Sequence, residues 1–210
     1  MTDSDTITGL LVTALENTWT AIRSRHPDVP DVVLTVGAGS IGSNELTLGH
    51  FAANRWVRGE YELHELFVGG EGLQRGAADV LGTLLHEAAH GAAAVRGIKD
   101  TSRQGRWHNE RFHALGAELG LTLAHDPKLG WSVTTVPEQT RQAYRHELDE
   151  LAFALVAYRR REPNRRGGRK SNNNGMTVEC DCGRKIRASA GTLAAGPIVC
   201  GVCQMPFQEV

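Results

Sequence analysis

The stretch Leu84–Gly97, LLHEAAHGAAAVRG, decides how the rest of the chain is interpreted. It carries two histidines four residues apart, His86 and His90, with Glu87 directly after the first. Residues at this spacing lie one turn apart on the same face of a helix, so both imidazoles can face one ion. Glu87 is turned by about 100° from His86, so it can flank the ion without binding it. The pattern therefore indicates either a metal site or a helix that carries two histidines by chance.

The residues around this motif favour the metal site. Apolar residues recur at helical spacing from Ala77 to Ala92, which predicts a helix that ends near Gly97. Histidines buried in such a helix without a partner would be costly. In hydrolytic zinc sites the metal acidifies a water molecule, and a nearby carboxylate accepts its proton. We therefore expect His86 and His90 to bind zinc and Glu87 to act as the general base.

A third metal ligand must come from another part of the chain, because catalytic zinc sites use three protein ligands and a water. The extension that needs Gly at position 93 and His at position 96 is absent, since the chain has Ala93 and Arg96. His108 lies where a polar loop meets the next expected helix, and its position favours it. His113 is turned by about 140° from it, so the two are not expected to share the ion. The downstream candidates are His108, Glu110, His113, Glu118 and His125.

Four cysteines form two close pairs near the C-terminus: Cys180 with Cys182, and Cys200 with Cys203. Pairs separated by about 17 residues suit a tetrahedral zinc site of four thiolates. Disulfides are the alternative. However, the acidic start of the chain does not resemble a signal peptide, so we expect a cytoplasmic protein whose thiols stay reduced. Metal binding would also supply the folding free energy that a unit of about 35 residues lacks.

Charge and composition divide the chain. The formal net charge is -1, but the balance is -7 before Tyr158 and +6 from Tyr158 onward. We expect a peptidase-like body over residues 1–161, a basic linker of polar residues, proline and glycine over 162–175, and a zinc ribbon over 176–210. No apolar run approaches the roughly 18 residues that span a membrane, so no membrane contact is expected.

The basic side chains of the linker and the ribbon indicate an anionic partner. A basic arm joined to a ribbon suits binding to the phosphate backbone of DNA. Phe207 is the only ring in the ribbon, so little base stacking or sequence preference is expected. The alternative is that these arginines only keep a linker solvated. The predicted contacts are Arg165, Arg166, Arg169, Lys170, Arg184, Lys185 and Arg187.

The segments around the motif predict helices and a small mixed sheet, which together give an α+β fold. Residues 32–37 are short and β-branched, and residues 46–57 and 61–70 predict a hairpin. If the resemblance described below to a zincin-like fold holds, residues 61–70 are the natural candidate for the edge strand that runs beside the motif helix and pairs with an extended substrate. His64 on this strand could face the cleft, but a surface or core position is the favoured alternative. Tyr144 and His146 are candidates for an oxyanion donor. Other helices are expected over residues 6–25 and 109–121 and from Pro137 onward.

Together, LLHEAAH (84–90), RWHNERF (106–112) and LGAELGL (115–121) resemble the SprT-like family of zinc metallopeptidases. His108 and Phe112 match a histidine and a phenylalanine that start the second helix in that family. Trp107 and Asn109 stand where the family often has glycine. The resemblance implies that His108 is the third ligand, and that a zincin-like domain precedes a zinc ribbon. It also implies cleavage of proteins held on or near DNA, as in the repair of DNA–protein crosslinks.

The sequence therefore predicts a zinc-dependent endopeptidase with protein substrates, one catalytic zinc ion and one structural zinc ion. One alternative is a nucleic-acid-binding or transcription-associated accessory factor with an idle peptidase site. A purely structural metal site does not require Glu87, so its presence argues against this alternative. A second alternative is a metal-dependent hydrolase that acts on a bond other than the peptide bond.

Overall fold

The structure is a computed structural model that describes residues 6–40, 46–161 and 175–209. The chain divides into two compact units, residues 1–162 and 163–210, which are described separately. This division falls at the start of the expected linker. Most of that linker, with Arg165, Arg166, Arg169 and Lys170, lies outside the described residues.

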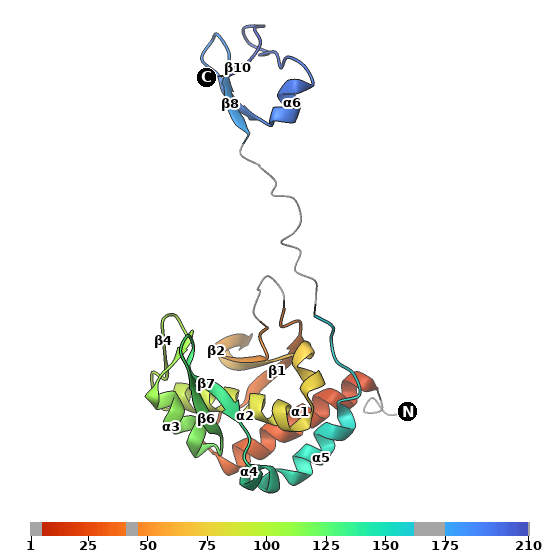
Figure 1. Cartoon of the computed structure of the whole chain (residues 1–210), viewed down its shortest axis with the longest axis vertical. Coiled ribbons are helices and arrows are strands. Elements are labelled where there is room, and N and C mark those ends of the chain that lie inside the picture. The colour runs from red at the N-terminus through yellow and green to blue at the C-terminus, as the bar shows by residue number, and fades with distance from the viewer. Residues whose placement is uncertain (1–5, 41–45, 162–174, 210) are drawn as a thin grey trace. The chain divides into compact units, whose positions relative to one another are not determined.

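Helix α2 (Ala77–Val95) is the central element of the first unit (Figure 1). The apolar stripe predicted for it is confirmed, since Leu81, Leu84 and Leu85 are completely buried. The helix is followed by Gly97, whose positive φ of 64° suits glycine. Packed against α2 are α1 (Ile7–Arg25), α3 (Glu110–Glu118), α5 (Arg145–Ala154) and the short 3₁₀ helix η2 (Gly70–Arg75).

The first sheet has the order β1-β3-β2. Its strands are β1 (Val32–Gly37), β2 (Gly49–Arg58) and β3 (Tyr61–Gly69), and β2 and β3 form the predicted antiparallel hairpin. The predicted edge strand is wrong, because β3 lies in the centre and pairs in parallel with β1 on its other side. Leu66 and Val68 make β3 the most buried of the three strands, so it takes the central position. Strand β2 is therefore the edge strand that packs against α2.

The second sheet lies beside α3 and has the order β4-β5-β7-β6 (Figure 1). Strands β4 and β5 have two residues each, which is too short for a hydrophobic period to show. The sheet nevertheless places His108, which pairs with Gly130 across β5 and β7. Its strands are β4 (Thr101–Ser102), β5 (Trp107–His108), β6 (Thr122–Asp126) and β7 (Gly130–Thr135).

The last helix, expected to be continuous from Pro137, is broken into α4 (Glu138–Ala143) and α5. The break falls at Tyr144, whose φ and ψ are -108° and 28°. Its ring is buried under the Arg25 guanidinium, 4.3 Å from the ring centroid. Arg25 also donates a 2.7 Å hydrogen bond to the Ala143 carbonyl, which satisfies an acceptor at the end of α4. Packing against α1 therefore overrides the helical periodicity here.

A buried carboxylate, Glu71, binds Arg159 in the segment that follows α5. Glu71 is 1% exposed and accepts hydrogen bonds from the Gly39 amide, the Ser40 hydroxyl and the Arg159 guanidinium at 2.7–2.8 Å. Burial alone would raise the pKa of Glu71, but these hydrogen bonds outweigh it and lower the pKa to about 2. Arg159 also donates its amide to the Gly70 carbonyl at 3.0 Å. The ionised Glu71 therefore ties three segments of the first unit together.

Replacing Glu71 with Gln is expected to destabilise the first unit by about 1–3 kcal/mol at pH 7. The folded pKa lies below the ordinary value of 4.5, so the stabilisation is present above that value and is lost as the pH falls towards about 2. Urea unfolding of both proteins at pH 7, 4.5 and 3 tests this. The difference between them should shrink at acid pH. A constant difference would show that the charge of Glu71 is not the stabilising feature.

The second unit is a small β structure with little apolar core. Its buried residues are Val178, Ala188 and two cysteines. Its described residues form one sheet of three strands, in the order β10-β8-β9, and one short helix. These are β8 (Met176–Glu179), β9 (Lys185–Ala188), β10 (Gln208–Glu209) and α6 (Ala190–Ala194). The chain is thus of mixed α+β class, and no helix among the described residues has the length and hydropathy to span a membrane.

Candidate metal centres

Three of the predicted ligands meet in the first unit. His86 and His90 lie on α2, and His108 lies on β5. One ring nitrogen from each lies within 4.8 Å of the others, and the Nε2 atoms of His90 and His108 are 3.2 Å apart. Phe112, which is completely buried on α3, packs against all three rings at centroid distances of 4.5–4.7 Å. The three imidazoles therefore converge on one point and all pack against the Phe112 ring.

The lowered pKa values of two of these imidazoles suit metal binding, which requires neutral rings. Burial lowers the pKa of His86 well below its ordinary value, and it also lowers the pKa of His108. Burial alone would also lower the pKa of His90, but a 2.6 Å hydrogen bond from Nδ1 to Asp100 outweighs it and raises that pKa. The Asp100 carboxylate fixes the ring so that Nε2 faces the other two histidines.

Asp100 is a residue of this candidate site that sequence reasoning missed. It lies in the polar segment after α2, where no motif marks it. His108 is held by the turn between β6 and β7. There the Asp126 carboxylate accepts hydrogen bonds from the amides of Lys128 and Leu129, at 2.7 and 2.9 Å. The Leu129 carbonyl accepts the His108 amide at 2.9 Å and lies 3.2 Å from Nδ1 of its ring. The rings of His90 and His108 are thus each oriented by an oxygen acceptor at Nδ1, which leaves Nε2 facing the other histidines.

Glu87 is buried beside the three histidines but is not one of the converging ligands. It is 5% exposed, and burial raises the pKa of its carboxyl. The Phe51 amide on the edge strand β2 donates a hydrogen bond to it. Strand β2 comes so close at Gly49 that a Cβ atom there would lie 2.8 Å from the Thr83 methyl and 3.1 Å from the Glu87 side chain. Glu87 therefore lies between helix and edge strand, as a base beside a metal would.

The other third-ligand candidates point elsewhere. The ring of His113 packs on Trp131 of β7 at 4.2 Å, and the ring of His125 lies 5.3 Å from Trp131. Glu110 accepts a hydrogen bond from the Trp131 indole, and Glu118 pairs with Arg96. Of the cleft candidates, Tyr144 is buried under Arg25 and His146 lies 3.8 Å from Glu150. His64 accepts the Asn54 amide on the hairpin. None of these three borders the cavities at the histidines.

The four cysteines gather in the second unit as free thiols. Their sulfur atoms all lie within 4.8 Å of one another, and Cys180 and Cys182 are 3.2 Å apart. Hydrogen bonds from the amides of Cys203 and Val202 lower the pKa of Cys200 to about 6. Amide donors around clustered sulfurs stabilise thiolates, so this donor set fits a zinc ion.

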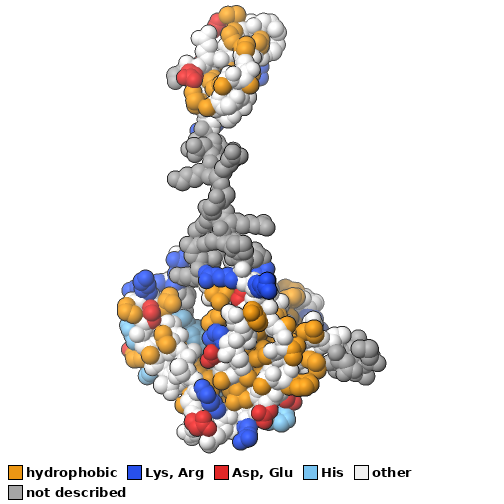
Figure 2. Space-filling model, turned by 45° about the vertical axis from the view of Figure 1, so that its right-hand side comes forward, with side chains coloured by type: hydrophobic (Ala, Val, Ile, Leu, Met, Phe, Trp, Pro, Cys, Tyr) orange, Lys and Arg blue, Asp and Glu red, His pale blue; other side chains and the backbone are white. Residues whose placement is uncertain are grey.

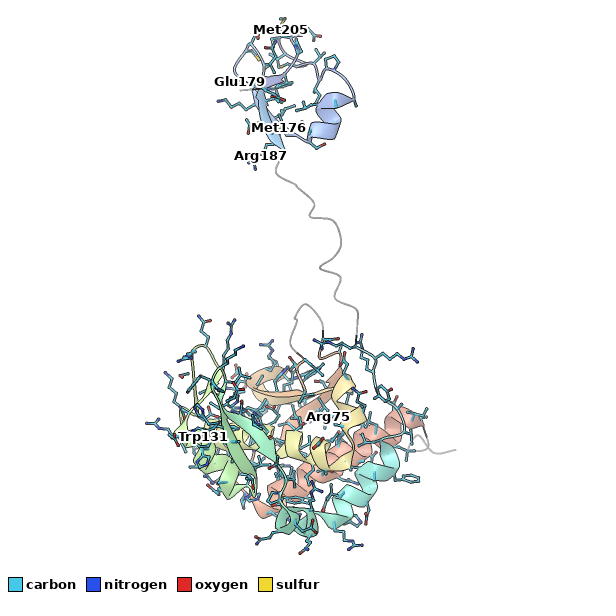
Figure 3. All side chains as sticks on the ribbon, in the orientation of Figure 1. Arg75, Trp131, Met176, Glu179, Arg187 and Met205 are labelled. Carbon is cyan, nitrogen blue, oxygen red and sulfur yellow. The ribbon has the colours of Figure 1, made fainter. Side chains whose placement is uncertain are left out.

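The basic residues of the second unit are partly engaged within it. The Arg184 guanidinium lies 4.0 Å from the Cys200 sulfur, and Lys185 pairs with Glu179 at 3.2 Å. Arg187 is exposed on β9 (Figure 3). The ribbon also exposes Val202 and Met205, and Figure 2 shows hydrophobic side chains on its visible face. Two of the three predicted nucleic-acid contacts in the ribbon therefore have partners inside it.

The purified full chain is expected to hold two zinc ions, one at the three histidines and one at the four cysteines. Elemental analysis gives the number of ions, and titration with a thiol reagent shows whether the cysteines are reduced. Cys200→Ser together with Cys203→Ser should remove one ion and leave the other. One ion per wild-type chain, with cysteines in disulfides, would contradict the ribbon site.

Comparisons of the sequence with protein-family models and with curated proteins gave no significant match, and a comparison with solved structures gave none either.

Proposed function

We propose that the chain is a zinc-dependent endopeptidase with a zincin-like first unit of the SprT-like kind. The observation that carries this is the convergence of His86, His90 and His108 with a buried, non-ligating Glu87 at their side. The residues border an open cavity of about 450 Å³, so a substrate can reach them. A structural metal site needs neither the cavity nor the carboxylate.

Zinc bound by the three histidines would supply Lewis-acid activation of a water molecule and of the scissile carbonyl. The chain's own residues supply the remaining steps. Glu87 accepts the proton of the attacking water and then delivers it to the leaving amine. Asp100 keeps the His90 ring in the orientation that binds metal. Among the described residues, strand β2 pairs only with β3, so its outer edge is where an extended peptide can pair, beside Glu87.

The test is cleavage of casein and of histones by the full chain, with and without DNA. Cleavage should stop with a chelator and return with added zinc. Cleavage of esters or other small substrates but of no peptide would favour a hydrolase that acts on a different bond. Zinc binding without hydrolysis of any substrate would favour the accessory factor.

We also propose that the substrates are proteins on or near DNA. This part is supported by the resemblance and by the charge balance of +6 from Tyr158 onward, against -7 before it. Removing residues after Arg161 is expected to abolish most DNA binding while peptide cleavage survives, because His86, Glu87, His90 and His108 all precede the cut. If three to five phosphates are neutralised, log K should fall with log salt at a slope of about -2 to -4.

Titration of DNA at two salt concentrations measures this loss. A full-length chain with Arg165, Arg166, Arg169 and Lys170 changed to Gln separates the linker from the ribbon. Equal DNA affinity of the full and truncated chains would show that the basic segment only solvates a linker.

A further inference from the structure

A second cavity, of about 290 Å³, adjoins the histidines and Glu87. His86, Glu87 and His108 border it, as they border the larger cavity. Its other walls come from residues 46–49, from the first half of α2 and from β7. A side chain bound in it would therefore belong to a residue next to the reacting bond. This placement makes the second cavity a candidate specificity pocket.

The charged group that distinguishes this cavity is Arg75, at the end of η2 (Figure 3). Its Nη2 donates a 2.7 Å hydrogen bond to the Thr83 hydroxyl and a 3.3 Å hydrogen bond to the Asp79 carbonyl. Its Nε lies 3.4 Å from the Gly72 carbonyl. All three acceptors are uncharged, so they orient the guanidinium without neutralising it. Arg75 also takes part in none of the ion pairs recorded for the described residues.

Thr83 acts as a support for this guanidinium. Its hydroxyl donates to the Asp79 carbonyl at 3.1 Å, so its oxygen is free to accept from Arg75. Ser132 and Thr134 of β7 also line the cavity. A carboxylate is the group that an oriented guanidinium recognises best, and hydroxyl groups can donate to its remaining lone pairs.

Asp79 also borders the cavity and carries the opposite charge. Its carboxylate lies in the first turn of α2, where the helix N-terminus stabilises it. Among the described residues it has no recorded hydrogen-bond or ion-pair partner, so its side chain is less fixed than Arg75. Asp79 should therefore weaken, but not cancel, the attraction for an acid.

We propose that this cavity binds the side chain of an acidic substrate residue next to the scissile bond, with Arg75 as the specificity-determining residue. The proposal rests on the proposed peptidase function and deepens it. It predicts that substrates with Glu at one position next to the scissile bond are cleaved faster than substrates with Gln, which has the same size.

The experiment uses the full chain and short peptides that carry Glu, Gln or Lys at each position flanking the cleaved bond. The ratio of kcat/KM for Glu over Gln should be about 10 or more at one position in the wild type. It should fall to near 1 in Arg75→Gln and rise in Asp79→Asn. Arg58→Gln, which removes the same charge from the exposed end of β2, is the matched control and should leave the ratio unchanged.

A second measurement does not depend on cleavage. The same peptides are titrated into a Glu87→Gln chain with and without Arg75→Gln, and Glu peptides should bind better only when Arg75 is present. If the wild type cleaves nothing but this Arg75-dependent binding is found, the peptidase function fails and the acidic pocket stands. If binding and cleavage do not change with Arg75, or if Lys is preferred over Glu, the acidic pocket is overturned.

Discussion

Glu87→Gln should abolish peptide cleavage while both zinc ions stay bound. The amide has the size of the carboxylate and can still accept the Phe51 amide, but it cannot take a proton from water. Loss of a general base typically costs about 10²–10⁴-fold in rate, and next to a metal the loss can be larger. The measurements are kcat/KM on a soluble peptide and the zinc content of the same preparation.

Glu16→Gln is the control for this change, because Glu16 is exposed on α1. It should leave cleavage and zinc content at wild-type values. Near wild-type cleavage by Glu87→Gln would remove the proposed role of Glu87 and favour an accessory factor. Loss of zinc together with cleavage would show instead that the carboxylate supports the metal ligands.

His108→Ala should release zinc from the first unit and abolish cleavage. Two ligands from α2 would remain, and these leave an incomplete site that binds zinc more weakly by about 100-fold or more. His113→Ala, five residues later, should change little, since its ring packs on Trp131 away from the metal position. Zinc titration against a fluorescent chelator, with peptide cleavage in parallel, distinguishes the two variants.

The opposite outcome, with His113 essential and His108 dispensable, would mean that the β4–β5 segment does not hold His108 beside α2. Thermal unfolding of each variant shows whether a loss of activity reflects the metal site or the fold. His108→Gln keeps much of the side chain's size and hydrogen bonding, so it separates ligand loss from a packing defect.

The sequence was informative wherever function depends on local spacing. His86 and His90 are one helical turn apart, so the helix alone brings them together. Short spacing along the chain likewise brings together the two cysteines of each pair. His108 was favoured by its place before a helix, and the structure brings it to the other two histidines. Asp100 could not be found in this way, because its hydrogen bond to His90 depends on how the chain turns after α2. The centre of the first sheet was misassigned because pairing between β1 and β3 is set by burial over a long chain separation.

The close packing around Gly49 restricts which residues can occupy this position. Any side chain there would meet Thr83 and Glu87 at once. Even alanine would therefore require a shift of the Thr83 methyl or of the edge strand, and a small adjustment of Glu87. The restriction falls on a residue without a side chain, so an alignment of functional groups alone would overlook it. If active relatives of this chain are found, they should keep glycine at the position of Gly49. A natural chain with the three histidines and a larger residue there would be expected to bind zinc without cleaving peptides.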